Sequence, residues 1–241
     1  MRRLSIVTVI LNAEKTLPRL TAALELEDQD AFEWICIDGL SSDASLSIAK
    51  SARIKNKIIT SEIDVGIYDA MNKGAKLCNG EWIWFINSDD IPAQNSVKAI
   101  NKILEYSPTD LALVSFGCLI FNGLKFEKVH FGSSWKLRIQ NSIPHPSTLF
   151  RKDLFEAYDY NKKYRICGDY DLFVRLIILG KCKIKFFNEV IVTHYRGGAS
   201  SNSNVSHLES DEIRRTLFLK HTYLIVNILK RTYIFLKQIQ F

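Results

Sequence analysis

Short apolar runs alternate with amphipathic stretches through the first half of the chain. The apolar runs have the length of buried strands and lie at residues 4–11, 34–37, 57–60 and 82–86. The stretches between them carry apolar residues at helical spacing and lie at residues 16–26, 44–52 and 67–77. Strands and helices that alternate in this way are typical of a mostly parallel sheet flanked by helices. The pattern therefore predicts an α/β fold with a Rossmann-like central sheet.

Apolar runs in the second half are spaced less regularly. They predict strands at residues 111–116, 125–131, 147–151, 183–187 and 190–194. A helix is expected over Tyr170 to Leu179, and one or two helices from about Ser206 to the end. A chain of 241 residues fits one domain with an appendage. We therefore expect a domain over residues 1–205 and a helical extension over residues 206–241.

The positive charge of the chain is concentrated near its C-terminal end. No Asp or Glu occurs from Ile213 onward, whereas six basic residues do: Arg214, Arg215, Lys220, Lys230, Arg231 and Lys237. The other 26 of the 32 basic residues balance the 26 acidic ones, so the body is neutral. The extension has no run of 18 apolar residues and is not expected to span a bilayer. A basic amphipathic helix is typical of anionic membrane surfaces, and packing on the domain or on a partner subunit is the alternative.

The cysteines indicate a reducing compartment. Their number is odd and their spacing wide, at Cys36, Cys78, Cys118, Cys167 and Cys182. No CxxC pair or zinc-like cluster occurs, which disfavours a disulfide framework and structural zinc. The first apolar run is cut short by Asn12 and Glu14, so it predicts a strand and not a signal peptide. We therefore expect a cytoplasmic protein, with any membrane contact peripheral and on the inner face. No motif for binding nucleic acid is present.

Polar side chains follow the apolar runs of the first half, where open parallel sheets bind their ligands. They are Thr8, Asn12, Glu14, Asp38, Asp64 and the segment 87–90. The turn over Leu11 to Lys15 has no glycine, so it lacks the G-x-G-x-x-G fingerprint of dinucleotide-binding domains, and a P-loop is also absent. A bound diphosphate would therefore need another counter-charge, such as Mg²⁺ or Mn²⁺ held by carboxylates. Asp89 and Asp90 are candidates, with capping of the next helix as the alternative.

Several motifs in order resemble the inverting family 2 glycosyltransferases, which have the GT-A fold. These motifs are the stretch Ser61 to Gly74, then Gly80-Glu81, then Asn87-Ser88-Asp89-Asp90. The resemblance covers Leu4 to Asn204 and is greatest to bacterial members that build polysaccharide, capsule or O-antigen. It implies a nucleotide-binding half over residues 1–115 and an acceptor-binding half over residues 116–205.

The resemblance also implies roles for individual residues of the donor site. Asp38 matches the residue that accepts a hydrogen bond from the nucleobase, although a turn-forming Asp-Gly is the alternative. Asp89 matches the last acidic residue of the DxD metal motif, in which Asn87 replaces the first Asp. Asp90 and His194 are further metal candidates. The remaining residues implied to contact the nucleotide or donor sugar are Thr8, Asn12, Glu14, Asp64, Asp69, Asn72, Lys73, Asn87 and Ser88.

For the acceptor side, the resemblance places Asp169 at the position of the catalytic base, with Gly168 in place of the usual Glu. Capping of the following helix is an alternative that is compatible with catalysis. His145, Asp171 and Arg196 are implied to border the acceptor.

The expected activity is metal-dependent, inverting transfer from a nucleoside-diphosphate sugar, UDP-linked by family frequency, to a saccharide or lipid-linked saccharide. Rival functions are a nucleotidyltransferase, which would need a glycine-rich basic loop after the first strand, and a non-catalytic binding protein derived from the enzyme.

Overall fold

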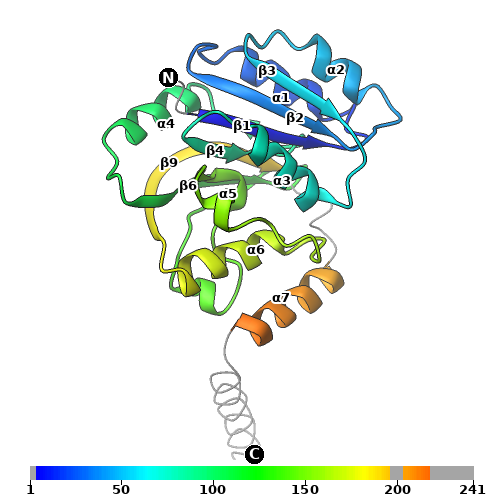
Figure 1. The fold of residues 1–241 in the computed structure, drawn as a ribbon. Helices are drawn as coiled ribbons and strands as arrows, with labels where there is room; N and C mark the ends of the chain where they lie inside the picture. The colour runs from blue at the N-terminus through cyan, green and yellow to red at the C-terminus, as the bar shows by residue number, and fades with distance from the viewer. Residues whose placement is uncertain (1–3, 196–202, 218–241) are drawn as a thin grey trace, which may run out of the picture.

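The structure is a computed structural model that describes residues 4–195 and 203–217 (Figure 1). Its centre is a nine-stranded sheet in the order β3-β2-β1-β4-β8-β6-β9-β5, with β7 paired to β6. The strands are β1 (Leu4–Ile10), β2 (Phe32–Asp38), β3 (Lys57–Ser61), β4 (Trp82–Phe85), β5 (Ile91–Pro92), β6 (Leu111–Phe121), β7 (Phe126–His130), β8 (Thr148–Arg151) and β9 (Lys183–Tyr195). The helices are α1 (Leu17–Glu25), α2 (Ser45–Ser51), α3 (Ile67–Leu77), α4 (Ser96–Glu105), α5 (Leu154–Ala157), α6 (Gly168–Phe173), α7 (Ser203–Leu217) and the short turns η1 (Lys136–Arg138), η2 (His145–Ser147) and η3 (Val174–Leu179).

Strands β1 to β4 form the parallel part of the sheet that the apolar runs predict. Nearly every residue of β1, β2 and β4 is buried, as expected for strands covered by helices on both faces. Gly80 lets the chain pass close to β1, because a Cβ at this position would lie 2.6 Å from the Ser5 hydroxyl oxygen. Because β1 to β4 run parallel, their carboxyl ends lie at the same edge of the sheet.

The rest of the sheet differs from the sequence prediction. β8 runs antiparallel to both β4 and β6, and the two strands expected at 183–187 and 190–194 are one strand, β9. Irregular register between β6 and β9 accounts for the polar interruption in the middle of β9. The expected helix at 170–179 begins at Gly168 and continues beyond Phe173 as a π-helical turn. Helix α4 was not predicted.

Helices cover both faces of the sheet (Figure 1). One core contains side chains of α1, α2 and α4, and the other contains side chains of α3, α6 and α7. In α7 the side chain of Ile213 is fully buried. Helix α7 crosses the predicted boundary between residues 205 and 206, and Ile213 packs in the core of the domain, so the division at 205 stays a prediction.

The five cysteines are all described and all free, as expected. Within residues 4–195 and 203–217, no helix has the length and apolar character needed to span a bilayer. Residues 218–241, most of the predicted basic extension, lie outside the described residues.

Candidate active site

The loops that follow β1 and β2 are joined by side-chain hydrogen bonds. Asn12, which has a left-handed φ of 51°, accepts a hydrogen bond at Oδ1 from the backbone N–H of Ser42, 2.9 Å away. The carboxylate of Glu14 accepts one from the backbone N–H of Ala44 at 3.2 Å. These contacts fix the glycine-free turn after β1. Asn12 and Glu14, which are predicted to contact the nucleoside, therefore lie at the rim of the carboxyl edge of the sheet.

Asp38 holds the next two loops together. Its side chain is fully buried and accepts hydrogen bonds from the backbone N–H of Ser41 and from the Ser61 hydroxyl, the latter at 2.6 Å. The carboxylate of Asp64 lies directly above Gly39, where any side chain would collide with it. The turn that Asp38 begins is therefore covered by the loop after β3.

The segment after β4 brings the predicted metal ligands together. Asp90 is fully buried, and its Oδ1 lies 2.7 Å from Nδ1 of His194 at the end of β9. Burial and the neighbouring charge of Asp90 raise the pKa of Asp89, while His194 and Arg19 act in the opposite direction. Asp90 and His194 are thus neighbours with Asp89 beside them, although Asp90 and His194 are 104 residues apart in the sequence.

The donor set of this segment fits a hard divalent cation. Oδ1 of Asn87 and Oδ2 of Asp90 are buried, and neither has a hydrogen-bond partner within the described part of the chain. Within those same ranges, no three His, Cys, Asp and Glu side chains are grouped to hold an ion by themselves. Mg²⁺ commonly binds through one or two carboxylates and takes its remaining ligands from substrate phosphates and water. The residues present match that kind of site.

Asp169 lies at the start of α6, where three groups contact its carboxylate. The side-chain amide of Asn141 donates to Oδ2 at 2.8 Å, and the backbone N–H of Tyr170 donates to Oδ1 at 2.8 Å. The hydroxyl of Tyr68, at the start of α3, lies 3.5 Å from the same Oδ1. Burial and the charge of Asp169 raise the pKa of Tyr68 well above its ordinary value, so this phenol stays protonated. The carboxylate is half-buried and held in one orientation.

A second carboxylate fixes the segment that leads into Asp169. Glu209 of α7 accepts hydrogen bonds from three successive backbone N–H groups, those of Arg165, Ile166 and Cys167, at 2.7 to 2.9 Å. These N–H groups lie just before α6 and make no hydrogen bond within that helix. A negative charge near the N-terminus of a helix is also favoured by the helix dipole. Glu209 therefore positions the chain segment that carries Asp169.

His145 is a buried ring that packs among aromatic side chains. Its Nε2 is 2.7 Å from the Tyr160 hydroxyl, and the ring lies against Phe85 and Phe150. Burial lowers the pKa of His145, and the negative charges of Asp169 and Asp90 oppose this shift. Carboxylates from both halves of the chain therefore act electrostatically on this ring.

Four of the residues predicted to contact substrate are packed inside the protein. Thr8 accepts a hydrogen bond from the Trp34 indole, and Asn72 makes two hydrogen bonds to the backbone of Tyr160. Asp171 is paired with Arg175 at 2.7 Å. The four residues are 8% exposed or less: Thr8, Asn72, His145 and Asp171. Their polar groups have internal partners, and their contact with substrate stays a prediction.

The remaining predicted residues lie at or near the strand edge. Lys73 contacts both Glu62 and Asp69, so its charge is already balanced, and Asp69 also pairs with Lys162. The Ser88 hydroxyl is 3.4 Å from that of Thr16. Arg196 lies outside the described residues.

Sequence reasoning missed Asn141, Tyr68 and Glu209. Asn141 stands in an irregular loop without a motif, and Tyr68 lies in a quoted motif but was not singled out. Glu209 was assigned to the extension and hence not to the site. Only their positions in the folded chain indicate a role.

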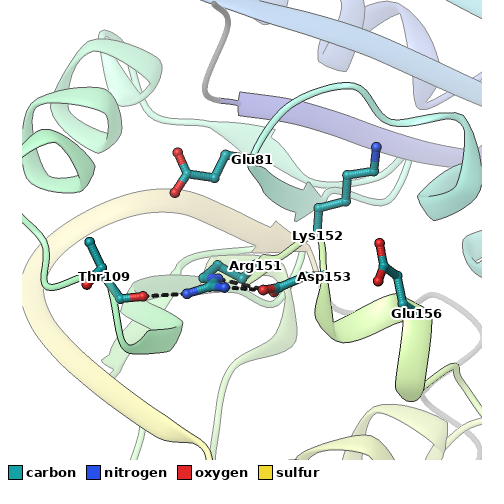
Figure 2. Close-up of a pocket in the computed structure, with 6 residues that line it drawn as sticks. All are labelled: Glu81, Thr109, Arg151, Lys152, Asp153 and Glu156. Atoms are coloured by element: carbon teal, nitrogen blue, oxygen red, sulfur yellow. Dashed lines mark hydrogen bonds and ion pairs between the residues drawn. The ribbon is translucent and has the colours of Figure 1, made fainter.

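A separate hollow lies at the opposite edge of the sheet, beside the start of β4 (Figure 2). Its lining is Glu81, Thr109, Arg151, Lys152, Asp153 and Glu156. Arg151 is bound there by Asp153 and by the carbonyl of Thr109. This hollow is distant from the acidic strand edge, since Arg151 pairs with Trp82 at the amino end of β4.

The mixed sheet with helices on both faces and acidic residues at its carboxyl edge defines a GT-A glycosyltransferase. The model of glycosyl transferase family 2 matches residues 5–166. The chain belongs to that family, and it is a glycosyltransferase.

Relatives and solved structures agree with this assignment. A PGL/p-HBAD biosynthesis glycosyltransferase of Mycobacterium tuberculosis is 28% identical over 210 residues, which are 83% of this chain and 80% of the relative. The crystal structure of Staphylococcus aureus TarS 1-349 with UDP-GlcNAc has a TM-score of 0.73 at 18% identity, covering 90% of this chain and 65% of that one. Mannosyltransferase PcManGT from Pyrobaculum calidifontis, with GDP-Man and Mn²⁺, has a TM-score of 0.61 at 15% identity, covering 94% and 65%. The structural likenesses establish the fold.

Proposed function

We propose that this enzyme transfers a sugar, with inversion, from a nucleoside-diphosphate sugar to a hydroxyl of a saccharide or lipid-linked saccharide. The observation that carries the proposal is the presence of two separate acidic regions: the buried oxygens of Asn87 and Asp90 after β4, unpartnered among the residues that the structure describes, and the Asp169 carboxylate held by Asn141 at the start of α6. One region suits the diphosphate of a donor, and the other suits proton removal from an acceptor.

Asp169 is proposed as the general base. It takes the proton from the acceptor hydroxyl while that oxygen bonds to the anomeric carbon, and the bond from this carbon to the diphosphate oxygen breaks with its electron pair. A single displacement of this kind inverts the anomeric configuration. The side chain of Asn141 and the backbone N–H of Tyr170 orient the Asp169 carboxylate, Tyr68 donates to the carbonyl of Ile166 beside it, and Glu209 holds the backbone before it.

The donor is proposed to lie over the carboxyl edge of β1, β2 and β4. The rim formed by Asn12, Glu14 and Asp64 would face the nucleoside, in a pocket whose floor Asp38 organises. Asp89 would be the main protein ligand of Mn²⁺ or Mg²⁺, with Asn87 and the Asp90–His194 pair beside it. When bound, such an ion stabilises negative charge on a leaving diphosphate.

The relatives guide the choice of substrates. TarS was solved with UDP-GlcNAc and PcManGT with GDP-Man, so uridine and guanosine donors are the first to test. The M. tuberculosis relative acts in PGL/p-HBAD biosynthesis, and the poly(ribitol-phosphate) beta-N-acetylglucosaminyltransferase TarS of S. aureus is 25% identical over 119 residues, 47% of this chain and 21% of that one. These names guide the acceptors to test, and a saccharide or lipid-linked saccharide and a cytoplasmic location stay the proposal. A membrane contact through residues 218–241 stays a prediction.

Donor binding tests the proposal before any acceptor is known. Thermal unfolding is measured with UDP, GDP and their sugar forms, with Mn²⁺ or with a chelator. Ligand at about 100 times its dissociation constant stabilises the folded state by about 2.7 kcal/mol. We expect a higher melting temperature with one nucleoside diphosphate, and only when metal is present. No stabilisation by any of these ligands with metal would reject the proposed function.

A further inference from the structure

A segment of the acceptor half carries apolar side chains that are exposed within residues 4–195 and 203–217. It comprises the tip between β6 and β7, strand β7 and the following loop, residues 122–139. Leu124 at the tip is 92% exposed and Trp135 in the loop is 66% exposed. The other exposed apolar residues of the segment are Phe126, Val129, Phe131 and Ile139. We call this segment the β7 surface.

The exposure of these side chains does not come from a loosely held loop. Two hydrogen bonds between Ser133 and Ser142, one of them at 2.7 Å, close the base of the loop. Between the exposed residues, Leu137 is fully buried, and its carbonyl accepts a hydrogen bond from the hydroxyl of Tyr170. Trp135 and Ile139 therefore project outward from an anchored segment.

The charge of the β7 surface is strongly positive. Residues 122–139 contain Glu127 as their single acidic residue, against four basic ones: Lys125, Lys128, Lys136 and Arg138. Burial lowers the pKa of His130 on β7, and the charges of Lys128 and Lys136 act in the same direction. Exposed aromatic and aliphatic groups are thus interspersed with cationic groups, and an anionic bilayer surface has the complementary chemistry.

Two contacts connect the β7 surface to the proposed base and to the end of α7. Asn141, two residues beyond Ile139, donates to Asp169 at 2.8 Å. Arg214 of α7 donates to the backbone carbonyl of Ile139 at 3.0 Å. α7 ends at Leu217, and residues 218–241 contain four basic residues and no acidic one. The loop that carries Trp135 and Ile139 is therefore joined directly to the acceptor side of the site.

We propose that the β7 surface is a bilayer-binding surface, in which Leu124 and Trp135 enter the interface of an anionic membrane while the neighbouring lysines contact lipid headgroups. Resting on the proposed function, this contact brings a lipid-linked acceptor to Asp169 from the membrane side. The membrane contact is thereby assigned to the catalytic domain itself, independently of residues 218–241.

The test is sedimentation of the full chain with phosphatidylcholine vesicles that contain or lack phosphatidylglycerol, at low and high salt. One variant combines Leu124→Ala with Trp135→Ala, and another combines Lys125→Glu with Lys128→Glu. We expect wild-type binding only with phosphatidylglycerol and at low salt. The charge variant should partition about 30-fold more weakly, since each lysine near the surface contributes about 1 kcal/mol, a factor of about five. The apolar variant should lose about tenfold.

Matched controls carry the same changes elsewhere on the surface. Lys98→Glu with Lys102→Glu lies on α4, and Leu26→Ala with Tyr106→Ala removes two side chains that are 83% and 79% exposed. These controls should bind vesicles as wild type does. Equal binding of the β7-surface variants and wild type would overturn the proposal, as would equal losses in the controls. A wild-type dimer that Leu124→Ala with Trp135→Ala dissolves, without vesicle binding, would assign the surface to a second copy instead.

Nucleoside-diphosphate binding, measured by thermal unfolding, separates this proposal from the proposed function. All variants should keep it, because none of the changed residues lies at the donor edge. Vesicle binding without nucleotide binding in the wild type would reject the proposed function and leave the bilayer surface standing.

Discussion

The donor half and the acceptor half hold their acidic groups by different means. Asp38 is the last residue of β2 and Asp89 follows β4, and both strands are fixed to β1 by parallel backbone hydrogen bonds. Asp169 starts a six-residue helix and is held by side chains that are 28 and 101 residues away in sequence. The donor edge is therefore a product of the sheet, whereas the base depends on contacts between distant loops.

Each half also contains a glutamate that binds backbone N–H groups. Glu33 on β2 accepts from the N–H groups of Asn79 and Gly80 and from the Ser5 hydroxyl, and it joins β1, β2 and β4 at their amino ends. Glu209 does the same for the segment before Asp169. The first glutamate is part of the core of the fold, and the second is close to the proposed chemistry. The same substitution in each should therefore have different consequences.

The largest effect is expected from Asp169→Asn. It removes the proposed base and keeps the shape of the side chain, so sugar transfer should fall by about 1,000-fold. Because the donor edge is built independently of α6, the affinity for the nucleoside diphosphate should stay within about twofold. The measurements are release of nucleoside diphosphate from the sugar donor, and donor binding by calorimetry. Wild-type turnover in this variant would remove Asp169 from the role of base.

Asp89→Asn should instead impair both turnover and metal-dependent donor binding. We expect a turnover loss of about 100-fold, together with loss of the Mn²⁺-dependent gain in melting temperature on adding nucleoside diphosphate. Asp110→Asn is a suitable control, since Asp110 pairs with Lys183 on the surface and should change neither property. If Asp89→Asn lowers turnover but leaves metal-dependent binding intact, the division of roles between the two halves is wrong.

The difference between the halves explains which strands and helices could be located from the sequence and which could not. Strand and helix periodicity located β1 to β4 and α1 to α3 within a few residues, because parallel strands buried on both faces are continuous apolar runs. The long β9 was divided in two, since Asn188 and Glu189 interrupt its apolar pattern where the register with β6 shifts. Local patterns carry no information on such long-range register.

The same limit applies to the site. The location of strand-end residues such as Asp64, Asp89 and Asp90 can be predicted because it follows from the strands. The contacts of Asn141 and Glu209 cannot, since each reaches Asp169 or its segment only through tertiary contacts. A sequence also does not reveal that Thr8 and Asn72 have internal hydrogen-bond partners.

Glu33→Gln should lower stability and leave catalysis of the folded enzyme unchanged. Burial raises the pKa of Glu33, but the hydrogen bonds from Ser5, Asn79 and Gly80 outweigh burial and lower it. Losing a charge-assisted hydrogen bond of this kind costs about 2 kcal/mol, which lowers the melting temperature of a chain this size by roughly 4–8 °C.

The stabilising contribution of the Glu33 carboxylate should depend on pH, in a direction set by its lowered pKa. A carboxyl whose folded pKa lies below its ordinary value of 4.5 contributes stability that is fully present above that pH. The contribution is lost as the pH falls through the lower folded pKa. The stability difference between wild type and Glu33→Gln, measured by urea unfolding, should therefore be constant near neutral pH and shrink below about pH 4.5. A difference that grows on acidification would contradict this assignment.

The smallest effect is expected from Glu209→Gln, which makes the same chemical change in the acceptor half. One of its oxygens becomes an NH₂ group that cannot accept from the N–H groups before α6, so Asp169 loses part of its fixed orientation. We expect kcat to fall about fivefold to tenfold with little change in the KM for the donor, because misplacement of a base affects the transition state more than donor binding. Glu209→Asp should recover part of the loss, since a carboxylate is restored. Glu212→Gln, one turn along on the same helix and paired with Lys163, is the matched control and should retain wild-type kcat. A loss of stability as large as that of Glu33→Gln, with kcat of the folded enzyme unchanged, would show that α7 supports the fold and not the base, and the two halves would then differ less than their contacts indicate.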